Sequence, residues 1–240
     1  MNPAATQRGC RAGPQFHGQE RLVCVCVCQP RQLNNVQNLQ HLRVNLNHTW
    51  NLAIDYRAPH LAVNFLSENF TGTPEESLVL DVACGTGLVA KLMVELGFRR
   101  FVGVDGSKGM LDQAAESGLY QDLNQALLGS DPLPAQPGAF DVVMIIGALR
   151  PGFVPVSVIK EIYQAAKPGN QLRSCAGDEY KVSMEQELQL MEDEGLWTLV
   201  ATKEMHRYML NFYQNYNEGE QNEHYLNGTM YLYRKAHNES

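Results

Sequence analysis

Two glycines follow a short apolar run in the first half of the chain. The run spans residues 78–83, and Gly85 and Gly87 lead from it into a segment with helical apolar spacing. Glycines in a turn between a strand and a helix let the backbone approach a bound ligand closely. Asp105 closes the next apolar run, where its carboxylate can accept hydrogen bonds from ribose hydroxyls. The spacing therefore predicts a site for a ribose-bearing ligand.

An acidic residue, Asp81, interrupts the first apolar run four residues before Gly85. A carboxylate at that position would repel the pyrophosphate of a dinucleotide such as NAD, but it would attract the ammonium group of a methionine moiety. With no ligand nearby, an acid in a buried strand would be an unpaired charge, which is energetically unfavourable. The residues therefore favour S-adenosylmethionine as the ligand, with NAD and an empty turn as the less favoured alternatives.

Strand and helix patterns alternate through the chain after residue 56. Apolar runs typical of strands are predicted at residues 78–83, 101–105, 124–128, 140–147, 197–202 and 229–233. Helical apolar spacing follows Pro59, Gly87 and Ser107 and occupies residues 155–167 and 179–194. This alternation predicts an α/β fold, a Rossmann-like, doubly wound and mostly parallel sheet of about seven strands with helices on both faces. Ligands of such sheets bind beyond the carboxyl ends of the strands, where the glycine turn lies.

Composition and charge limit the classes of protein to which the chain can belong. Of its 240 residues, 44% are hydrophobic and 19% are charged, as in globular proteins. The excess of 26 Asp and Glu over 19 Lys and Arg gives a net charge of −7, which argues against a nucleic acid partner. The longest uncharged apolar run, residues 142–149, is shorter than the roughly 20 residues that cross a bilayer, and no leader opens the chain. We therefore expect neither membrane spanning nor secretion, and a cytoplasmic or nuclear location.

The first 47 residues differ in composition from the remainder. They contain five Arg and one acid and are rich in Asn and Gln. We expect residues 1–47 to be a mobile tail and residues 48–240 to form a single domain. Within the tail, Cys24, Cys26 and Cys28 alternate with valines, and strand geometry would place them on one face, but the spacing lacks the partner ligands of a zinc site. No metal is therefore expected, and the role of these cysteines stays open.

Three motifs resemble those of the class I S-adenosylmethionine-dependent methyltransferases. Residues 80–87 are similar to the first motif of that family, residues 104–111 to the second, and residues 166–169 to the turn after the fourth helix. Further stretches resemble one branch of the family, the methyltransferase-like proteins of the Williams-Beuren syndrome chromosomal region. The resemblance is good from residue 56 to residue 169 and patchy beyond it.

The resemblance implies that the cofactor is S-adenosylmethionine, with its methionine part against the first motif, its ribose on Asp105 and its adenine against the residues that follow. Ile146, at the end of the fourth strand, is expected to line the pocket in which the methyl group meets its acceptor. Arg57 is added because a guanidinium at the start of the preceding helix could pair with the methionine carboxylate. The predicted cofactor-binding residues are Arg57, Asp81, Ala83, Gly85, Thr86, Gly87, Asp105, Gly106, Ser107, Met110, Ser130 and Ile146.

The chain departs from the family pattern at three places. Gly129 and Ser130 stand where members of the family often hold an acid that contacts the adenine. Residues 45–55 lack the Tyr- and Asp-rich pattern of the helix that closes over the cofactor. Residues 170–178 are too polar for a central strand, so the fifth strand is either rebuilt from residues 171–176 or degraded.

Methyl transfer from a sulfonium requires alignment of the acceptor rather than a catalytic triad, so no catalytic residue is assigned. The predicted function is methyl transfer from S-adenosylmethionine to a small-molecule or protein acceptor. The departures motivate an alternative, an S-adenosylmethionine-binding protein of weak or no activity that acts as a partner or regulator. An NAD-dependent dehydrogenase would use the same glycines but would leave Asp81 unexplained.

Overall fold

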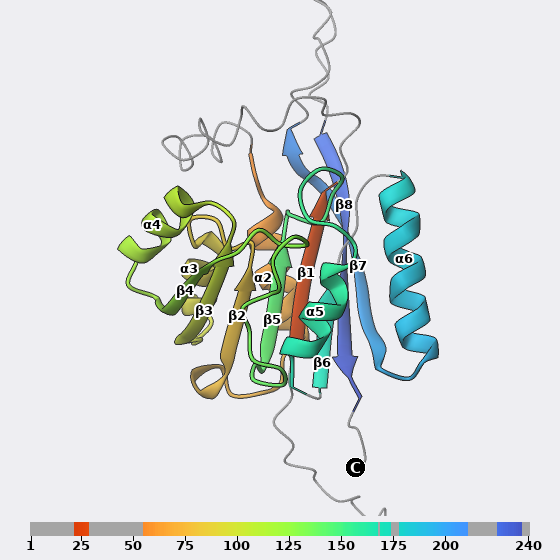
Figure 1. Ribbon diagram of the computed structural model, residues 1–240, viewed down its shortest axis with the longest axis horizontal. Coiled ribbons are helices and arrows are strands. Elements are labelled where there is room, and N and C mark those ends of the chain that lie inside the picture. Colours follow the sequence, from red (N-terminus) through yellow and green to blue (C-terminus); the bar gives the residue numbers. More distant parts are fainter. Residues whose placement is uncertain (1–21, 29–54, 168, 174–177, 211–224, 237–240) are drawn as a thin grey trace, which may run out of the picture.

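The computed structural model describes residues 22–28, 55–167, 169–173, 178–210 and 225–236, which form one β-sheet with helices packed against it (Figure 1). Its strands are β1 (Leu22–Cys28), β2 (Leu78–Val82), β3 (Arg100–Asp105), β4 (Tyr120–Gln125), β5 (Val142–Ile146), β6 (Gly169–Arg173), β7 (Trp197–Leu210) and β8 (Tyr225–Lys235). Its α-helices are α2 (Ala58–Asn69), α3 (Leu88–Glu95), α4 (Lys108–Glu116), α5 (Val158–Ala165) and α6 (Asp178–Asp193). Within these ranges no helix is both long enough and apolar enough to cross a membrane.

The strands follow the order β4-β3-β2-β5-β1-β8-β6, and β7 also pairs with β8. Strands β4, β3, β2, β5 and β1 run parallel to one another, whereas β8 runs antiparallel to β1, β6 and β7. In the view of Figure 1, α5 lies in front of the sheet and α2 behind it. This arrangement confirms the α/β class, with parallel strands and helices on both faces. The number of strands differs from the predicted seven because β1 adds one.

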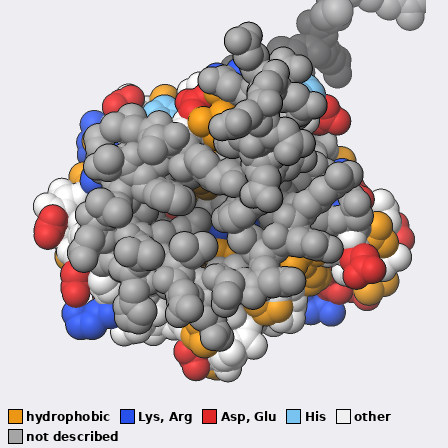
Figure 2. Space-filling model, turned by 90° about the horizontal axis from the view of Figure 1, so that it is seen from above, with side chains coloured by type: hydrophobic (Ala, Val, Ile, Leu, Met, Phe, Trp, Pro, Cys, Tyr) orange, Lys and Arg blue, Asp and Glu red, His pale blue; other side chains and the backbone are white. Residues whose placement is uncertain are grey.

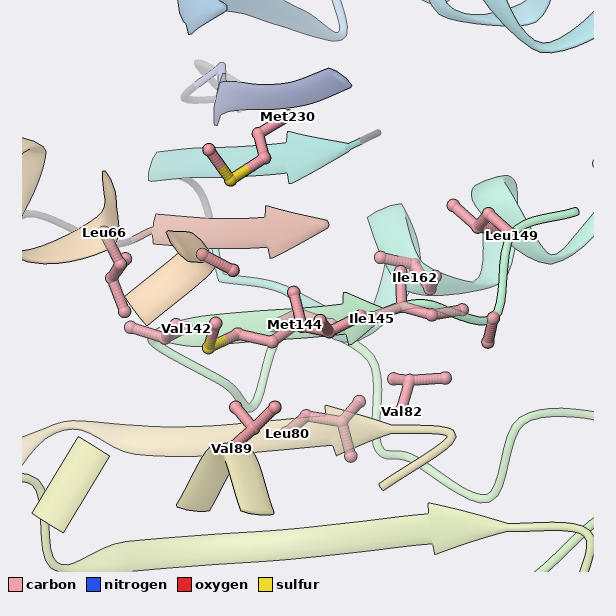
Figure 3. Close-up of a cluster of buried hydrophobic side chains, with 14 of the residues drawn as sticks. Leu66, Leu80, Val82, Val89, Val142, Met144, Ile145, Leu149, Ile162 and Met230 are labelled. Atoms are coloured by element: carbon pink, nitrogen blue, oxygen red, sulfur yellow. The ribbon is translucent and has the colours of Figure 1, made fainter. Parts of the chain in front are cut away.

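Strand β5 lies at the centre of the hydrophobic core. All five of its residues are buried, as expected for a parallel strand covered on both faces. Figure 3 shows how side chains from neighbouring elements gather around it, among them Leu80 of β2, Val89 of α3 and Ile162 of α5. The core therefore holds β2 and α3 together with α5, the helix that follows β5.

Strand β1 corrects the prediction of a mobile tail over residues 1–47. It lies between β5 and β8, with Val25 opposite Ile145 of β5 and Tyr231 of β8. Its sequence alternates Val and Cys, which suits a central strand, but its two partners lie more than a hundred residues away, so that local spacing could not reveal the pairing. The other residues of the segment 1–47 lie outside the described residues. So do residues 45–54, whose sequence lacks the family's pattern for the helix that closes over the cofactor.

The described part of the polar segment after α5, in which the sequence predicts the fifth strand, pairs with β8 and not with β5. Strand β6 is antiparallel to β8, and its residues 171–173 oppose residues 231–233. The same three residues of β8 also oppose residues 23–25 of β1. The position beside β5 is therefore taken by the apolar β1, and the strand predicted to be rebuilt over residues 171–176 is confirmed only as far as Arg173.

Strand β4 spans Tyr120–Gln125 instead of the predicted residues 124–128. It lies at the edge of the sheet and is only partly buried, so it lacks the apolar run expected of a strand. The buried residues Ala126 and Leu128 belong to the turn that follows it. The edge position of β4 explains this error.

The other edge of the sheet is anchored by Trp197 at the start of β7. Its ring is fully buried between Tyr163 of α5 and Tyr233 of β8, with centroid separations of 5.5 Å and 4.8 Å. Lys235 of β8 donates to the carbonyl oxygens of Tyr163 and Ala166. These contacts attach the antiparallel strands to α5.

Candidate functional site

The carboxyl ends of β2, β3 and β5 meet at one edge of the sheet, which Figure 2 views from above. Acidic and basic side chains of the described residues are interspersed around the rim of this face. The turn after β2 lies at this edge, and three of its residues have left-handed backbone angles: Ala83 at φ 56°, Gly85 at φ 56° and Gly87 at φ 80°. A left-handed conformation is unfavourable by about 1 to 2 kcal/mol for a residue with a Cβ, so Ala83 is strained. Strain in a ligand-facing turn is typical of functional sites.

Asp105 holds this turn against the start of α4. Its Oδ2 accepts a hydrogen bond from Gly85 N at 2.9 Å, and its Oδ1 accepts one from Ser107 N at 2.8 Å. Ser107 caps α4 by accepting from Met110 N. A carboxylate can accept about four hydrogen bonds, so both oxygens of Asp105 retain lone pairs for ribose hydroxyls. Burial raises the pKa of Asp105, because its carboxylate is partly desolvated.

Asp81 is 1% exposed in the adjacent strand β2. Its Oδ2 accepts a hydrogen bond of 2.7 Å from the hydroxyl of Tyr120. Burial raises the pKa of Asp81 to about 7, with the hydrogen bond from Tyr120 opposing this shift and the nearby Asp105 adding to it. Within the described part of the chain, no Lys, Arg or His forms an ion pair with Asp81 or Asp105. Two neighbouring carboxylates without a counter-cation favour a cationic ligand.

Tyr120 is a site residue that the sequence did not reveal. Its ring fills the space that side chains at Gly87 and Gly103 would occupy, because a Cβ at either position would come within 2.9 Å of a Tyr120 ring atom. A glycine inside a strand often marks such a close approach, and Gly103 of β3 was the available signal. Burial and the nearby carboxylates raise the pKa of the Tyr120 phenol, so it remains a hydrogen-bond donor to Asp81.

Gly85 differs from Gly87 in what surrounds it. A Cβ built on Gly85 would meet no atom of the described residues within 4 Å, although Gly85 lies between Asp105 and the strained Ala83. Among the described residues, no side chain therefore fills the space beside this backbone, near the two carboxylates. The neighbouring Cys84 is buried, and burial together with both carboxylates raises its pKa, so its thiol is not a nucleophile at neutral pH. Thr86 is partly buried and completes the turn.

The residues after β4 lie against the second motif. Ala126 N donates to Asp105 O, and Gln125 Nε2 donates to Gly106 O. The side chain of Leu127 is 59% exposed and lies next to Gly106, where a Cβ would approach it to 3.4 Å. An exposed apolar side chain beside Asp105 is suited to cover an aromatic ring such as adenine. Leu127 was missed because an isolated leucine in a loop carries no sequence signal.

Three of the predicted residues form no hydrogen bond or ion pair with Asp81 or Asp105. Ser130 is exposed and lines a separate pocket of ≈ 500 Å³ with residues of the following loop and Glu161 and Gln164 of α5. Arg57 is exposed at the start of α2; its backbone N donates to Tyr208 O, but its side chain forms no hydrogen bond or ion pair with any described residue. Ile146, 8% exposed, ends β5 at the same edge as the glycine turn.

The motif at residues 166–169 is structural. Lys167 Nζ forms an ion pair of 2.8 Å with Asp141, whose Oδ2 also accepts from Leu78 N. These contacts fasten the amino ends of β2 and β5 to the segment after α5, at the opposite end of the strands from the glycine turn. They stabilise the fold and lie away from the candidate site, which is at the carboxyl ends of the strands.

The central part of the chain is similar to known proteins. Residues 79–169 match the methyltransferase domain family. The chain is 46% identical over 147 residues to human Methyltransferase-like protein 27, covering 59% of this chain and 60% of that protein. It is 30% identical over 131 residues to a Ubiquinone biosynthesis O-methyltransferase of Pseudomonas aeruginosa, covering 51% of this chain and 55% of that enzyme. The chain therefore spans less than two thirds of the length of these relatives.

Solved structures share the fold at low sequence identity. A TehB-like SAM-dependent methyltransferase from Corynebacterium glutamicum aligns with a TM-score of 0.51 at 15% identity, covering 83% of this chain and 97% of that one. The magnesium protoporphyrin IX methyltransferase of Synechocystis PCC 6803, solved with bound SAM, aligns with a TM-score of 0.51 at 16% identity, covering 86% of both chains. At these identities the likeness establishes the fold.

Proposed function

We propose, from the premise that residues 79–169 form a methyltransferase domain, that this protein binds S-adenosylmethionine and transfers its methyl group to a small-molecule or protein acceptor. The observation that carries the proposal is a pair of carboxylates, the buried Asp81 and the partly buried Asp105, beside a glycine turn. Among the described residues no basic side chain pairs with either acid, and none fills the space at Gly85. S-adenosylmethionine brings an ammonium and a sulfonium to such a site, whereas NAD brings a pyrophosphate that the carboxylates would repel.

The residues present suit this cofactor. Asp81 is available to the ammonium group, and the open space at Gly85 admits the methionine part beside the backbone. Asp105 has free lone pairs for the ribose, and Leu127 offers an apolar wall for the adenine. We therefore replace Ser130 with Leu127 in the proposed adenine contact, because Ser130 lines another pocket.

The cofactor, when bound, supplies an electrophilic methyl group on a sulfonium that is already an activated leaving group. The protein's part is to align the acceptor and to exclude water from the site. Ile146, at the carboxyl end of β5, is placed to line the acceptor side. The alignment of the acceptor accounts for the activity we propose.

Isothermal titration of the full chain with S-adenosylmethionine, S-adenosylhomocysteine and NAD tests the proposal. We expect both adenosyl compounds to bind at one site per chain and NAD to give no signal. Binding of NAD alone would contradict the proposal and would favour a dehydrogenase. Binding of the adenosyl compounds by a protein that methylates none of a panel of small-molecule and protein acceptors would support the alternative of an inactive partner or regulator.

A further inference from the structure

Arg150 is a buried cation in the segment that follows β5. It follows Ile146, the last residue of β5, by four positions, and it is 5% exposed. Two other buried ionic side chains have partners: Asp81 accepts from Tyr120, and Asp141 pairs with Lys167. Arg150 differs from both, because the group that its guanidinium contacts among the described residues is an aromatic ring.

Among the described residues, the guanidinium of Arg150 contacts an aromatic ring and pairs with no carboxylate. Its Cζ lies 3.5 Å from the centroid of the Phe153 ring. Its Nε is buried without an acceptor, and among the described residues no carboxylate forms an ion pair with the guanidinium. An arginine presents five N–H donors, and a cation–π contact satisfies none of them.

An unpaired buried charge is retained in a protein only where something offsets its loss of hydration. The planar fork of a guanidinium matches the two oxygens of a carboxylate or a phosphate. Arg150 also lies where ligands of open α/β sheets bind, beyond the carboxyl end of a central strand. It follows β5, whereas the turn and acid that we assign to the cofactor follow β2 and β3.

We propose that Arg150 binds an oxyanion of the methyl acceptor, a carboxylate or a phosphate, and thereby selects anionic small molecules as substrates. The proposal rests on the proposed function, since it names the class of acceptor for the same site. The Phe153 ring lies against the face of the guanidinium, and an anion would approach the N–H donors along its edge. Arg150 is therefore a specificity-determining residue. It selects the acceptor and takes no part in the transfer of the methyl group.

The test uses benzoate, phenyl phosphate and the neutral isostere benzamide as probes. Each is titrated into the full chain alone and with saturating S-adenosylhomocysteine. We expect benzoate or phenyl phosphate to bind at least ten-fold more tightly than benzamide, and the tighter of the two identifies the oxyanion. Because a lost charge-assisted hydrogen bond lowers affinity by about ten- to a hundred-fold, Arg150→Met should abolish the preference, while Arg150→Lys should retain part of it. Arg100→Met, which removes an exposed arginine from β3, is the matched control and should change nothing.

Equal binding of benzamide and the anions, absence of anion binding, or an unchanged preference in Arg150→Met would overturn the proposal. A ten-fold loss of S-adenosylmethionine affinity in Arg150→Met would also overturn it, because Arg150 would then belong to the methionine carboxylate. Thermal melts guard against a folding artefact: removal of an unpaired buried charge should leave the melting temperature equal or higher, and an unfolded Arg150→Met protein would show a structural role. Anion binding without any binding of S-adenosylmethionine would contradict the proposed function and leave the anion site standing.

Discussion

The two sides of the sheet differ in how their strands are assembled. On the glycine-turn side, β2, β3 and β4 are joined in sequence by helices, and β5 completes the set, so that neighbours in space are near neighbours in the chain. On the other side, β8 pairs with β1 from the amino-terminal region and with β6 and β7. The proposed cofactor site lies on the first side. The second side is built from segments that are distant in the sequence and supports the fold. Mutations can therefore disturb the proposed site and the structural support separately.

Removal of β1 should have the largest effect. Deletion of residues 1–28 takes away the strand between β5 and β8, which leaves two strand edges without hydrogen-bond partners. We expect the melting temperature to fall by more than about 10 °C, or cooperative unfolding to vanish, since about 1 kcal/mol corresponds to 2 to 4 °C for a chain of this size. The control deletion of residues 1–21 leaves β1 intact and should change the melting temperature little. Equal melting of the two deletions would show that β1 adds nothing to the sheet.

Gly85→Val should abolish binding of S-adenosylmethionine while the domain stays folded. The valine would fill the open space at the turn and would adopt a left-handed angle, which is unfavourable by about 1 to 2 kcal/mol. Gly118→Val is a matched control, because Gly118 also has a positive φ and nothing within 4 Å of its Cβ, but it follows α4. We expect similar melting of both variants and loss of titration heat only in Gly85→Val. Retained binding there would move the cofactor away from the turn.

Asp105→Ala should weaken cofactor binding by about 1.5 to 3 kcal/mol, as for lost hydrogen bonds to a charged group. The variant also removes the acceptor for Gly85 N and Ser107 N, so a smaller loss of stability should accompany it. Asp112→Ala, which removes an exposed acid paired with Lys108 on α4, is the control. Unchanged affinity in a folded Asp105→Ala protein would show that this acid does not hold the ribose.

The smallest effect concerns the pH dependence of stability. Burial raises the pKa of Asp81 to about 7 in the folded protein, whereas an unfolded Asp titrates at about 3.9. Between these values the folded state holds a proton that the unfolded state has lost, so the stability of the unliganded protein should fall as pH rises from about 4 to about 7. Asp81→Asn should remove this dependence and gain about 1 to 3 kcal/mol at pH 8 relative to the wild type, but little at pH 4.

Urea unfolding at both pH values measures this difference, and Asp122→Asn, at an exposed acid of β4, serves as the control. A wild-type stability that is flat across this range would mean that Asp81 is ionised in the folded protein.

Local chemistry was readable from the sequence, and non-local pairing was not. The glycine turn, Asp105 and helix α6 follow from short-range spacing, and the structure confirms their positions. Tyr120 escaped prediction because its role depends on gaps left by glycines in two other elements. The cysteine and valine alternation of β1 was visible, yet nothing near it in sequence indicated β5 and β8 as its partners. Arg150 carried no sequence signal because only burial without a counter-ion distinguishes it.

The central claim is that S-adenosylmethionine binds at the glycine turn and Asp105. Backbone amide chemical shifts of the labelled full chain, recorded with and without S-adenosylmethionine, test it most directly. We predict the largest shifts at Gly85 and Ser107, whose amides donate to Asp105, and at Leu127 beside them. Shifts confined to the pocket of Ser130 and Glu161, with Gly85 and Ser107 unchanged, would contradict the account and place the cofactor elsewhere.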